Sequence, residues 1–265
     1  MSLLTSAATN SKTLEVLFAP AEFTALKQRD LSNTTCVVFD ILRATTSMTA
    51  ALSNGATEIF PVEKISEALA LREKIPGALL AGERDGLRIR AAQTGSIDFD
   101  LGNSPREFTA ENVCGKKIIT TTTNGTRALQ ACNGAKQILV GTFLNLSALA
   151  RSIEASNPAN LILVCAGTFE EAAYEDTLAA GALAELLWPY FSNGKIVDSA
   201  QIVRQIFLSA KKDFAAAIQL SRNARRLLAN PDLRDDVEFC FRRDTLDFVV
   251  EMSGGTVRKV SAGFD

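Results

Sequence analysis

Short apolar segments alternate with helical patterns along most of this 265-residue chain, and this alternation constrains the fold more than any other feature. Buried-type strands separated by helices are typical of the α/β class, in which a largely parallel or mixed sheet carries helices on both faces. The predicted strands are residues 14–19, 35–40, 58–62, 78–81, 117–121, 137–140 and 161–165, and the predicted helices are residues 46–52, 65–74, 125–132, 146–154 and 177–187.

Length and composition bound the number of domains. With 47% hydrophobic residues, a chain of this length has enough apolar side chains for a substantial core. No low-complexity linker divides it, so we expect a single α/β domain over residues 14–265, after a disordered segment at residues 1–13. Residues 198–240 have a mostly helical pattern and are expected to form a helical extension near the C-terminus.

Charge and cysteine content exclude several kinds of partner. The 28 Lys and Arg residues are balanced by 30 Asp and Glu residues, so the net charge of −2 provides no basic field for nucleic acid or a membrane surface. No apolar segment is long enough to span a bilayer, and the N-terminus lacks the pattern of a secretion signal. Five cysteines without a CxxC pair indicate free thiols, so we expect a cytoplasmic protein; a homo-oligomer is left open.

The chain contains no histidine, which removes several catalytic classes. Ser-His-Asp hydrolysis, histidine phosphatase chemistry and histidine-ligated zinc all need a residue that is absent here. Any divalent ion would have to be held by oxygen atoms, and carboxylates with phosphate oxygens and waters are the usual environment of magnesium. Cys165 is followed by acidic residues and no closing arginine, so we interpret it as an inert buried thiol.

An apolar strand runs directly into a hydroxyl-rich turn at residues 117–127, KIITTTTNGTR. Thr123 or Asn124 can cap the helix that follows, Gly125 lets a ligand approach the backbone, and free amides at a helix start attract anions. Arg127 adds a planar donor fork that suits phosphate or carboxylate. Helix capping alone also explains the threonine and the asparagine, so this segment by itself leaves both interpretations open.

Two other predicted strands, 35–40 and 161–165, end in similar polar turns. Ligands of open α/β sheets bind beyond the carboxyl ends of the strands, so three such turns on one edge are expected to surround one anionic ligand and a metal. The polar residues of these turns are Asp40, Arg43, Thr45 and Thr46 in the first case, and Gly167, Thr168, Glu175 and Asp176 in the second.

Five ordered motifs together resemble one known family. They are DILRATT at residues 40–46, LLAGERDG at 79–86, DFDLGNSP at 98–105, TTTNGTRAL at 121–129 and EDTLAAGA at 175–182. Any one motif is weak, but their combination closely resembles the 2-phosphosulfolactate phosphatase (ComB) family over about residues 37–187. The resemblance implies a magnesium-dependent phosphomonoesterase that converts 2-phospho-3-sulfolactate to 3-sulfolactate and phosphate, a step of coenzyme M biosynthesis.

Carboxylates within these motifs are the predicted ligands of Mg²⁺. Asp40, Glu83 and Asp176 are assigned to the ion, with Glu175 as a substitute for Asp176. Each acid also has a purely structural alternative, because Asp40 can cap the next helix, Glu83 can pair with Arg84, and Glu175 with Asp176 favours a helix start. In the predicted mechanism a water attacks the phosphorus directly, activated either by the metal or by a carboxylate.

Arginines and small polar residues are the predicted contacts to the substrate. Arg43, Arg84 and Arg127 are expected to bind its anionic groups, and Asp40, Glu83, Arg43 and Arg127 are the predicted catalytic residues. The predicted hydrogen-bond donors to the substrate are Thr45, Thr46, Asn103, Thr122, Asn124, Gly125, Thr126 and Thr168.

Two other functions remain open at this point: a phosphatase of another small anionic phosphoester, and a non-catalytic anion-binding protein on the same scaffold. The chain also departs from the family pattern. Asp85 occupies a position where glycine is expected, and the loop at residues 87–97 is longer and more basic than expected. These departures bear on substrate preference more than on reaction type.

Overall fold

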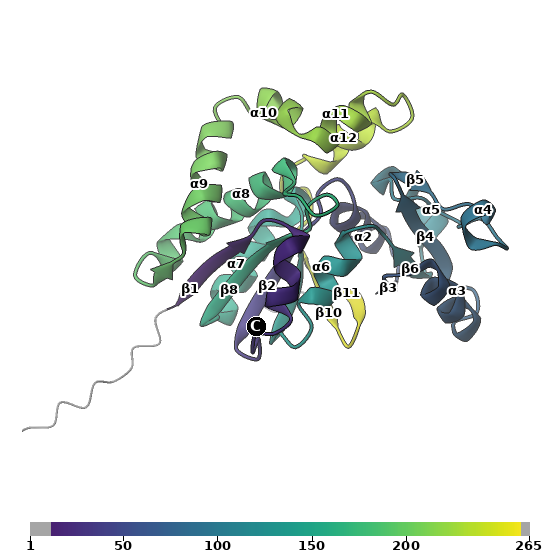
Figure 1. Ribbon diagram of the computed structural model, residues 1–265, viewed down its shortest axis with the longest axis horizontal. Coiled ribbons are helices and arrows are strands. Elements are labelled where there is room, and N and C mark those ends of the chain that lie inside the picture. The colour runs from purple at the N-terminus through teal and green to yellow at the C-terminus, as the bar shows by residue number, and fades with distance from the viewer. Residues whose placement is uncertain (1–11, 261–265) are drawn as a thin grey trace, which may run out of the picture.

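The computed structural model describes residues 12–260, and the strands found there form one 11-stranded sheet (Figure 1). Their order across the sheet is β5-β4-β6-β3-β11-β10-β7-β2-β8-β1-β9. Of the segment predicted to be disordered, residues 1–11 lie outside the described part, and Thr13 begins a strand. The strands are β1 (Thr13–Leu17), β2 (Thr34–Phe39), β3 (Glu58–Pro61), β4 (Leu79–Arg84), β5 (Leu87–Arg88), β6 (Lys117–Thr121), β7 (Gln137–Gly141), β8 (Asn160–Cys165), β9 (Lys195–Ile196), β10 (Val249–Ser253) and β11 (Thr256–Val260).

The seven predicted strands are confirmed as β1 to β4 and β6 to β8, while the C-terminal hairpin of β10 and β11 has no counterpart in the sequence-based expectation. Its turn contains Gly254 and Gly255 at φ values of 57° and 76°, which glycine adopts without strain. The hairpin lies in the middle of the sheet, where β10 pairs with β7 and β11 pairs with β3.

The hairpin separates two blocks of parallel strands. One block is β4, β6 and β3, and the other is β7, β2, β8, β1 and β9. Three successive antiparallel pairings, through β11 and β10, make the two blocks run in opposite directions. The three polar turns therefore do not lie on one edge of a single parallel block, since the turn after β6 belongs to the other block, but residues of all three turns line one cavity.

Twist of the sheet brings the two blocks together. Neighbouring strands are rotated by roughly 20–25° on average, and this rotation accumulates across the hairpin. Figure 1 shows β1, β2 and β8 on one side and β3, β4 and β6 on the other, with the hairpin between them. Residues that follow strands of both blocks consequently line one cavity.

The predicted α/β architecture with a helical C-terminal extension is confirmed. The five predicted helices are present as α2, α3, α6, α7 and α8. The predicted helical extension at residues 198–240 forms α9 to α12. The helices are α1 (Phe23–Leu26), α2 (Ala44–Ser53), α3 (Ile65–Lys74), α4 (Ala91–Thr94), α5 (Ala110–Val113), α6 (Gly125–Ala131), α7 (Leu146–Ser156), α8 (Tyr174–Phe191), α9 (Asp198–Ala210), α10 (Phe214–Leu220), α11 (Arg222–Leu228) and α12 (Arg234–Cys240), with short 3₁₀ turns at Pro20–Glu22, Pro105–Glu107 and Phe143–Asn145.

Strand β2 contributes alternate residues to two hydrophobic cores. Val37 and Phe39 pack in the core that includes α7, α8 and α9, whereas Cys36 and Val38 pack in the core that includes α2 and α6. Successive side chains of a strand point to opposite faces, so helices cover the sheet on both sides here. Between residues 12 and 260, no helix is both long and apolar enough to cross a membrane.

Candidate active site

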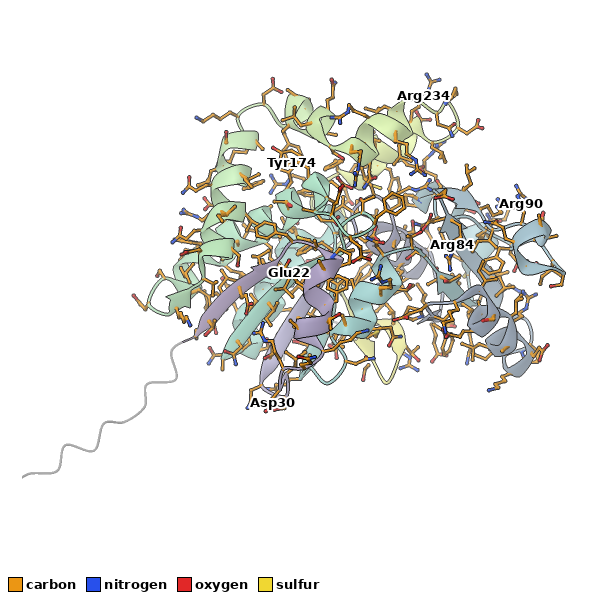
Figure 2. All side chains as sticks on the ribbon, viewed as in Figure 1. Glu22, Asp30, Arg84, Arg90, Tyr174 and Arg234 are labelled. Atoms are coloured by element: carbon orange, nitrogen blue, oxygen red, sulfur yellow. The ribbon has the colours of Figure 1, made fainter. Side chains whose placement is uncertain are left out.

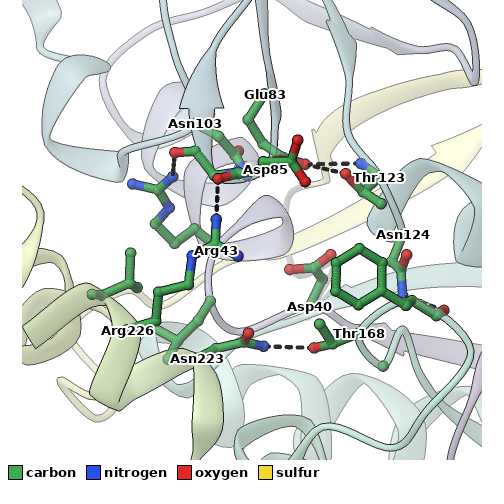
Figure 3. A pocket seen from close by; sticks show the side chains of 15 residues that line it. Asp40, Arg43, Glu83, Asp85, Asn103, Thr123, Asn124, Thr168, Asn223 and Arg226 are labelled. Atoms are coloured by element: carbon green, nitrogen blue, oxygen red, sulfur yellow. Dashed lines mark hydrogen bonds between the residues drawn. The ribbon is translucent and has the colours of Figure 1, made fainter. Parts of the chain in front are cut away.

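A cavity of about 630 Å³, counted with its open mouth, lies between the two blocks and the C-terminal helices (Figure 3). Both parallel blocks and α11 contribute to its wall, so the site depends on the whole fold. The lining residues are Asp40, Leu42, Arg43, Glu83, Asp85, Gly86, Asn103, Thr123, Asn124, Gly167, Thr168, Phe169, Asn223, Arg226 and Leu227.

Asp40 follows β2 directly and is held in place by the helix after it. Its Oδ1 accepts a hydrogen bond from the Ala44 amide at 3.0 Å, and the Thr45 hydroxyl donates to the Asp40 carbonyl at 2.9 Å. Its Oδ2 lies so close to Gly125 that a β-carbon there would approach it to 2.7 Å. Gly125 therefore makes room for this carboxyl group, which is a more specific role than the predicted approach of a ligand.

Burial raises the pKa of Asp40 to about 7. The hydrogen bond from the Ala44 amide opposes this rise, the charges of Glu83 and Glu175 add to it, and Arg43 opposes it. A carboxyl group with this pKa changes its charge near neutral pH, and such groups concentrate at functional sites.

Glu83 joins the turn after β4 to the turn after β6. Its Oε1 accepts hydrogen bonds from the amide and the hydroxyl of Thr123, at 2.8 and 2.9 Å, and its Oε2 accepts one from the Gly86 amide at 2.7 Å. Glu83 is 8% exposed and lines the cavity. Both carboxylate oxygens accept hydrogen bonds, so Glu83 holds the two turns in place. It also adds negative charge to the cavity wall.

Asp176 and Glu175 lie buried at the start of α8, behind the cavity wall. Asp176 accepts hydrogen bonds from the Ile41 amide at 2.8 Å and the Gly167 amide at 3.0 Å, which ties together the loops after β2 and β8. Burial, reinforced by Glu175 and Asp40, raises the pKa of Asp176. Neither Asp176 nor Glu175 lines the cavity. These two predicted metal ligands instead hold neighbouring loops in place.

Arg43 is fixed by a buried ion pair with α12. Its Nη1 lies 2.7 Å from Asp236 Oδ2, and its Nη2 donates to the Gly86 carbonyl at 2.7 Å. The other oxygen of Asp236 accepts a hydrogen bond from Ser104 at 2.6 Å. An arginine has five N–H donors in a rigid fork, so the remaining donors of Arg43 are held in a defined orientation at the cavity wall.

Four of the predicted threonine donors cap and brace their own turns. The hydroxyls of Thr45 and Thr46 donate to the carbonyls of Asp40 and Ile41. These hydrogen bonds brace the turn, and neither threonine lines the cavity, whereas Thr168 and Asn103 do line it. In the turn after β6, the Thr126 amide donates to Thr122 Oγ1 at 3.2 Å, and the Thr126 hydroxyl donates to the Thr122 carbonyl at 3.0 Å.

Asn124 carries an unsatisfied acceptor at the cavity. Its Nδ2 donates to the carbonyls of Ala166 and Phe169, both at 3.0 Å, and these two acceptors determine which way the amide is turned. Its Oδ1 is buried and has no hydrogen-bond partner, which is true of no other buried side-chain nitrogen or oxygen in the part of the chain that the structure describes. Such an atom calls for a ligand, a cation or a water.

Two of the predicted arginines do not line the cavity. Arg84 donates to Thr121 Oγ1 at 2.9 Å and to the Glu63 carbonyl, so its guanidinium braces β4 against β6 (Figure 2). Arg127 pairs with Glu170 at 3.0 Å, and the Arg127 side chain is more than a third exposed. The predicted catalytic role of Arg127 therefore has no support from its position.

Replacing Arg127 by alanine is expected to lower kcat/KM by less than about fivefold, because exposed ion pairs contribute little. Steady-state phosphate release by the purified Arg127→Ala enzyme checks this. A loss of a hundredfold or more in a folded variant would mean that Arg127 leaves Glu170 and turns to the substrate during the reaction.

The sequence analysis does not identify several lining residues. Asn223 and Arg226 come from α11, within the helical extension, whose sequence pattern indicates packing. They are three residues apart, so they share one face of the helix, and this spacing was the available signal. The unusual basic loop at 87–97 stays outside the cavity: Arg88 pairs with Glu107, and Arg90 pairs with Asp98 at the outer margin (Figure 2).

The donor atoms at the cavity fit magnesium better than a softer metal. Across residues 12–260, no group of three or more Asp, Glu or Cys side chains is arranged to hold a metal ion. Magnesium does not need one, because it commonly takes one or two protein oxygens together with waters and substrate phosphate. Two protein oxygens are available for this role: the unpartnered Asn124 Oδ1 and the Asp40 Oδ2 beside Gly125.

The fold and the cavity define a class of protein, an α/β protein with acids, arginines and amides gathered where strands end, as in enzymes of small anionic substrates. The family model described as 2-phosphosulpholactate phosphatase matches residues 22–255. The chain therefore belongs to the 2-phosphosulpholactate phosphatase family, and with it to the phosphoric monoester hydrolases.

Individual relatives agree with this assignment. A probable 2-phosphosulfolactate phosphatase of Caldanaerobacter subterraneus subsp. tengcongensis is 37% identical over 238 residues, which is 89% of this chain and 95% of the relative. Similar proteins with the same description occur in Caldicellulosiruptor saccharolyticus, at 37% over 87% of this chain and 93% of the relative, and in Pseudothermotoga lettingae, at 38% over 81% and 87%. The range matched by the family model includes the whole helical extension and all the described strands except β1 and β11.

Proposed function

We propose that this protein is a magnesium-dependent phosphatase that hydrolyses 2-phospho-3-sulfolactate to 3-sulfolactate and phosphate, a reaction of the coenzyme M biosynthesis type. The family and the names of the relatives support the reaction. The observation that carries the proposal is the presence of two groups among the residues that line the cavity: the Asp40 carboxyl group, with a pKa of about 7, and the unpartnered oxygen of Asn124.

The charges that line the cavity favour a bound cation. The acids are Asp40, Glu83 and Asp85, and only Arg43 and Arg226 oppose them among the described lining residues. A phosphoester that carries two more acidic groups would be repelled by such a wall. A divalent ion held by Asp40 and Asn124 would reverse the balance, and it would neutralise the phosphoryl oxygens and lower the pKa of a water.

The protein's own groups mainly position the reactants. Phosphoryl transfer passes through a loose transition state that needs little covalent help, so orientation and electrostatic stabilisation carry most of the rate. Arg43, locked by Asp236 and the Gly86 carbonyl, presents its remaining N–H donors to the phosphoryl oxygens. The side chain of Asn103, which also lines the cavity, adds a further donor to the same group.

In the overall reaction a water forms the new O–P bond as the bond to the leaving oxygen breaks. One proton of the water ends on the alcohol of 3-sulfolactate, and the rest of the water stays with the phosphate. Burial raises the pKa of the Cys165 thiol well above its usual value, which agrees with an inert residue and with attack by water.

Phosphate release from a panel of phosphoesters tests the proposal. With Mg²⁺, we expect turnover of 2-phospho-3-sulfolactate, loss of turnover after treatment with EDTA, and recovery when Mg²⁺ is restored. Full activity after verified metal removal would contradict the metal requirement. Release only from other phosphoesters would identify a different phosphatase, and no release from any compound would favour a non-catalytic anion-binding protein.

A further inference from the structure

Arg226 differs from the other arginine of the cavity in what holds it. Arg43 is 4% exposed and is paired with a fully buried carboxylate, so it is a fixed part of the wall. Arg226 lies at the exposed rim, where its guanidinium donates to the carbonyl of Asp85 (Figure 3). Among the ion pairs between described residues, none includes Arg226. Its charge is thus available to a ligand in the cavity.

A hydrogen-bond network at the start of α11 fixes the position of Arg226. Ser221, at the start of α11, donates to Glu175 Oε2 at 2.6 Å, and Asn223 donates to Glu175 Oε1 and to Thr168 Oγ1, both at 2.6 Å. These bonds fix the first turn of α11 over the loop after β8. Three residues on from Asn223, Arg226 projects from the same face into the cavity.

The opposite wall also accommodates Arg226. Gly86 faces its guanidinium so closely that a β-carbon at this position would collide with it. Gly86 has a φ of 77°, which glycine adopts without strain. The β4–β5 turn therefore leaves space for Arg226 and contacts it through the neutral carbonyl of Asp85. One hydrogen bond orients the guanidinium, and the positive charge of Arg226 is not neutralised by an ion pair.

We infer that Arg226 binds one of the two acidic groups of the substrate that are not hydrolysed, the sulfonate or the carboxylate, and thereby determines specificity. This inference rests on the proposed function, in which Arg43 and the cation serve the phosphoryl group. A second acidic group needs its own donor fork, because leaving it unpaired in the cavity would cost affinity. Arg226 has the charge, the geometry and the freedom from ion pairs that this task requires.

Three substrates that differ by one acidic group test the inference. They are 2-phospho-3-sulfolactate, 2-phospholactate, which lacks the sulfonate, and 2-phosphoethanesulfonate, which lacks the carboxylate. The kcat/KM values of wild type, Arg226→Ala and Arg226→Lys are compared as ratios between substrates. Arg225→Ala is the matched control, because Arg225 is exposed on the same helix, donates to the Gln219 and Leu220 carbonyls, and does not line the cavity.

In Arg226→Ala, the preference for one of the two acidic groups is expected to fall by roughly 10- to 100-fold, the range for a hydrogen bond to a charged group. If the preference for 2-phospho-3-sulfolactate over 2-phospholactate falls, Arg226 binds the sulfonate. If the preference over 2-phosphoethanesulfonate falls, Arg226 binds the carboxylate. Arg226→Lys should recover only part of the preference, since a point charge does not reproduce the fork. Arg225→Ala should keep the ratios of wild type. Inhibition constants for 3-sulfolactate and lactate should show the same pattern without any chemical step.

Equal loss on all three substrates in Arg226→Ala, or unchanged ratios, would overturn the inference while leaving the phosphatase activity established. Absence of phosphate release from all three substrates by the wild-type enzyme would instead overturn the proposed function. The two failures are therefore distinguished by the wild-type measurement alone.

Discussion

Replacing Asp40 by asparagine is expected to lower kcat/KM by roughly 10²- to 10⁴-fold, the range for losing a charged group that acts directly in the reaction. Asparagine keeps the shape and can still accept the hydrogen bond from Ala44, so the fold is retained while the charge is lost. If Mg²⁺ binds at Asp40 as proposed, it should raise the melting temperature of the wild type, and this increase should shrink in Asp40→Asn. Asp30→Asn, at an exposed carboxylate that accepts from the Ser32 amide, is the control.

The same substitution tests the raised pKa of Asp40. Between about pH 4 and pH 7, the unfolded protein has lost this proton and the folded protein still holds it, so the free energy of unfolding in EDTA falls as the pH rises. Subtracting the Asp40→Asn curve from the wild-type curve isolates this slope from those of other carboxylates. If Mg²⁺ binds the ionised form as proposed, saturating Mg²⁺ should reduce this fall within the same pH range. Parallel curves in EDTA would contradict the shift.

Removing Asp236 is expected to have the largest effect on stability. Asp236→Ala leaves the buried guanidinium of Arg43 without its partner, which typically costs about 3–5 kcal/mol in the free energy of unfolding. The kcat/KM value should fall as well, because the orientation of Arg43 is lost. Urea unfolding, followed by far-UV circular dichroism and by the fluorescence of the single tryptophan, measures the first effect.

Glu238→Ala is the matched control for this experiment. Glu238 lies on the same helix, α12, and forms an exposed pair with Arg242, so its loss should cost less than about 1 kcal/mol. If Asp236→Ala destabilised the protein as little as Glu238→Ala does, Arg43 would have to reach water in the folded enzyme. The buried network of Arg43, Asp236 and Ser104 would then not hold the wall of the site.

The sequence was sufficient to predict the parallel strands and the central acid of the cavity. Strands such as β2 and β8 are continuous apolar runs, and this pattern arises because both of their faces are buried. Asp40 could be found because it is a carboxylate at the end of such a run. Its raised pKa could not be found, since that depends on burial and on Glu83, which comes from the other block.

Threonine roles could not be separated from sequence alone, because capping a helix and binding an anion draw on the same hydroxyl. Thr122 accepts from the Thr126 amide in the first turn of α6 and Thr45 donates to the Asp40 carbonyl, whereas Thr123 lines the cavity. The spacing of Asn223 and Arg226 was not enough to assign them to the site, for a different reason. A helix that carries several arginines looks solvated from its sequence, and only the tertiary placement of α11 turns one face of it to the site.

The central hairpin also has a consequence for how the enzyme is made. Residues 249–260 pair with strands at residues 137–141 and 58–61, so contacts of very long sequence separation join the two halves of the catalytic cavity. During synthesis the earlier strands emerge first, and long-range pairings of this kind form slowly. Until residues 249–260 leave the ribosome, Asp40 and Glu83 belong to two blocks of strands that no hairpin joins into one sheet. The complete cavity therefore forms only after this hairpin has been synthesised.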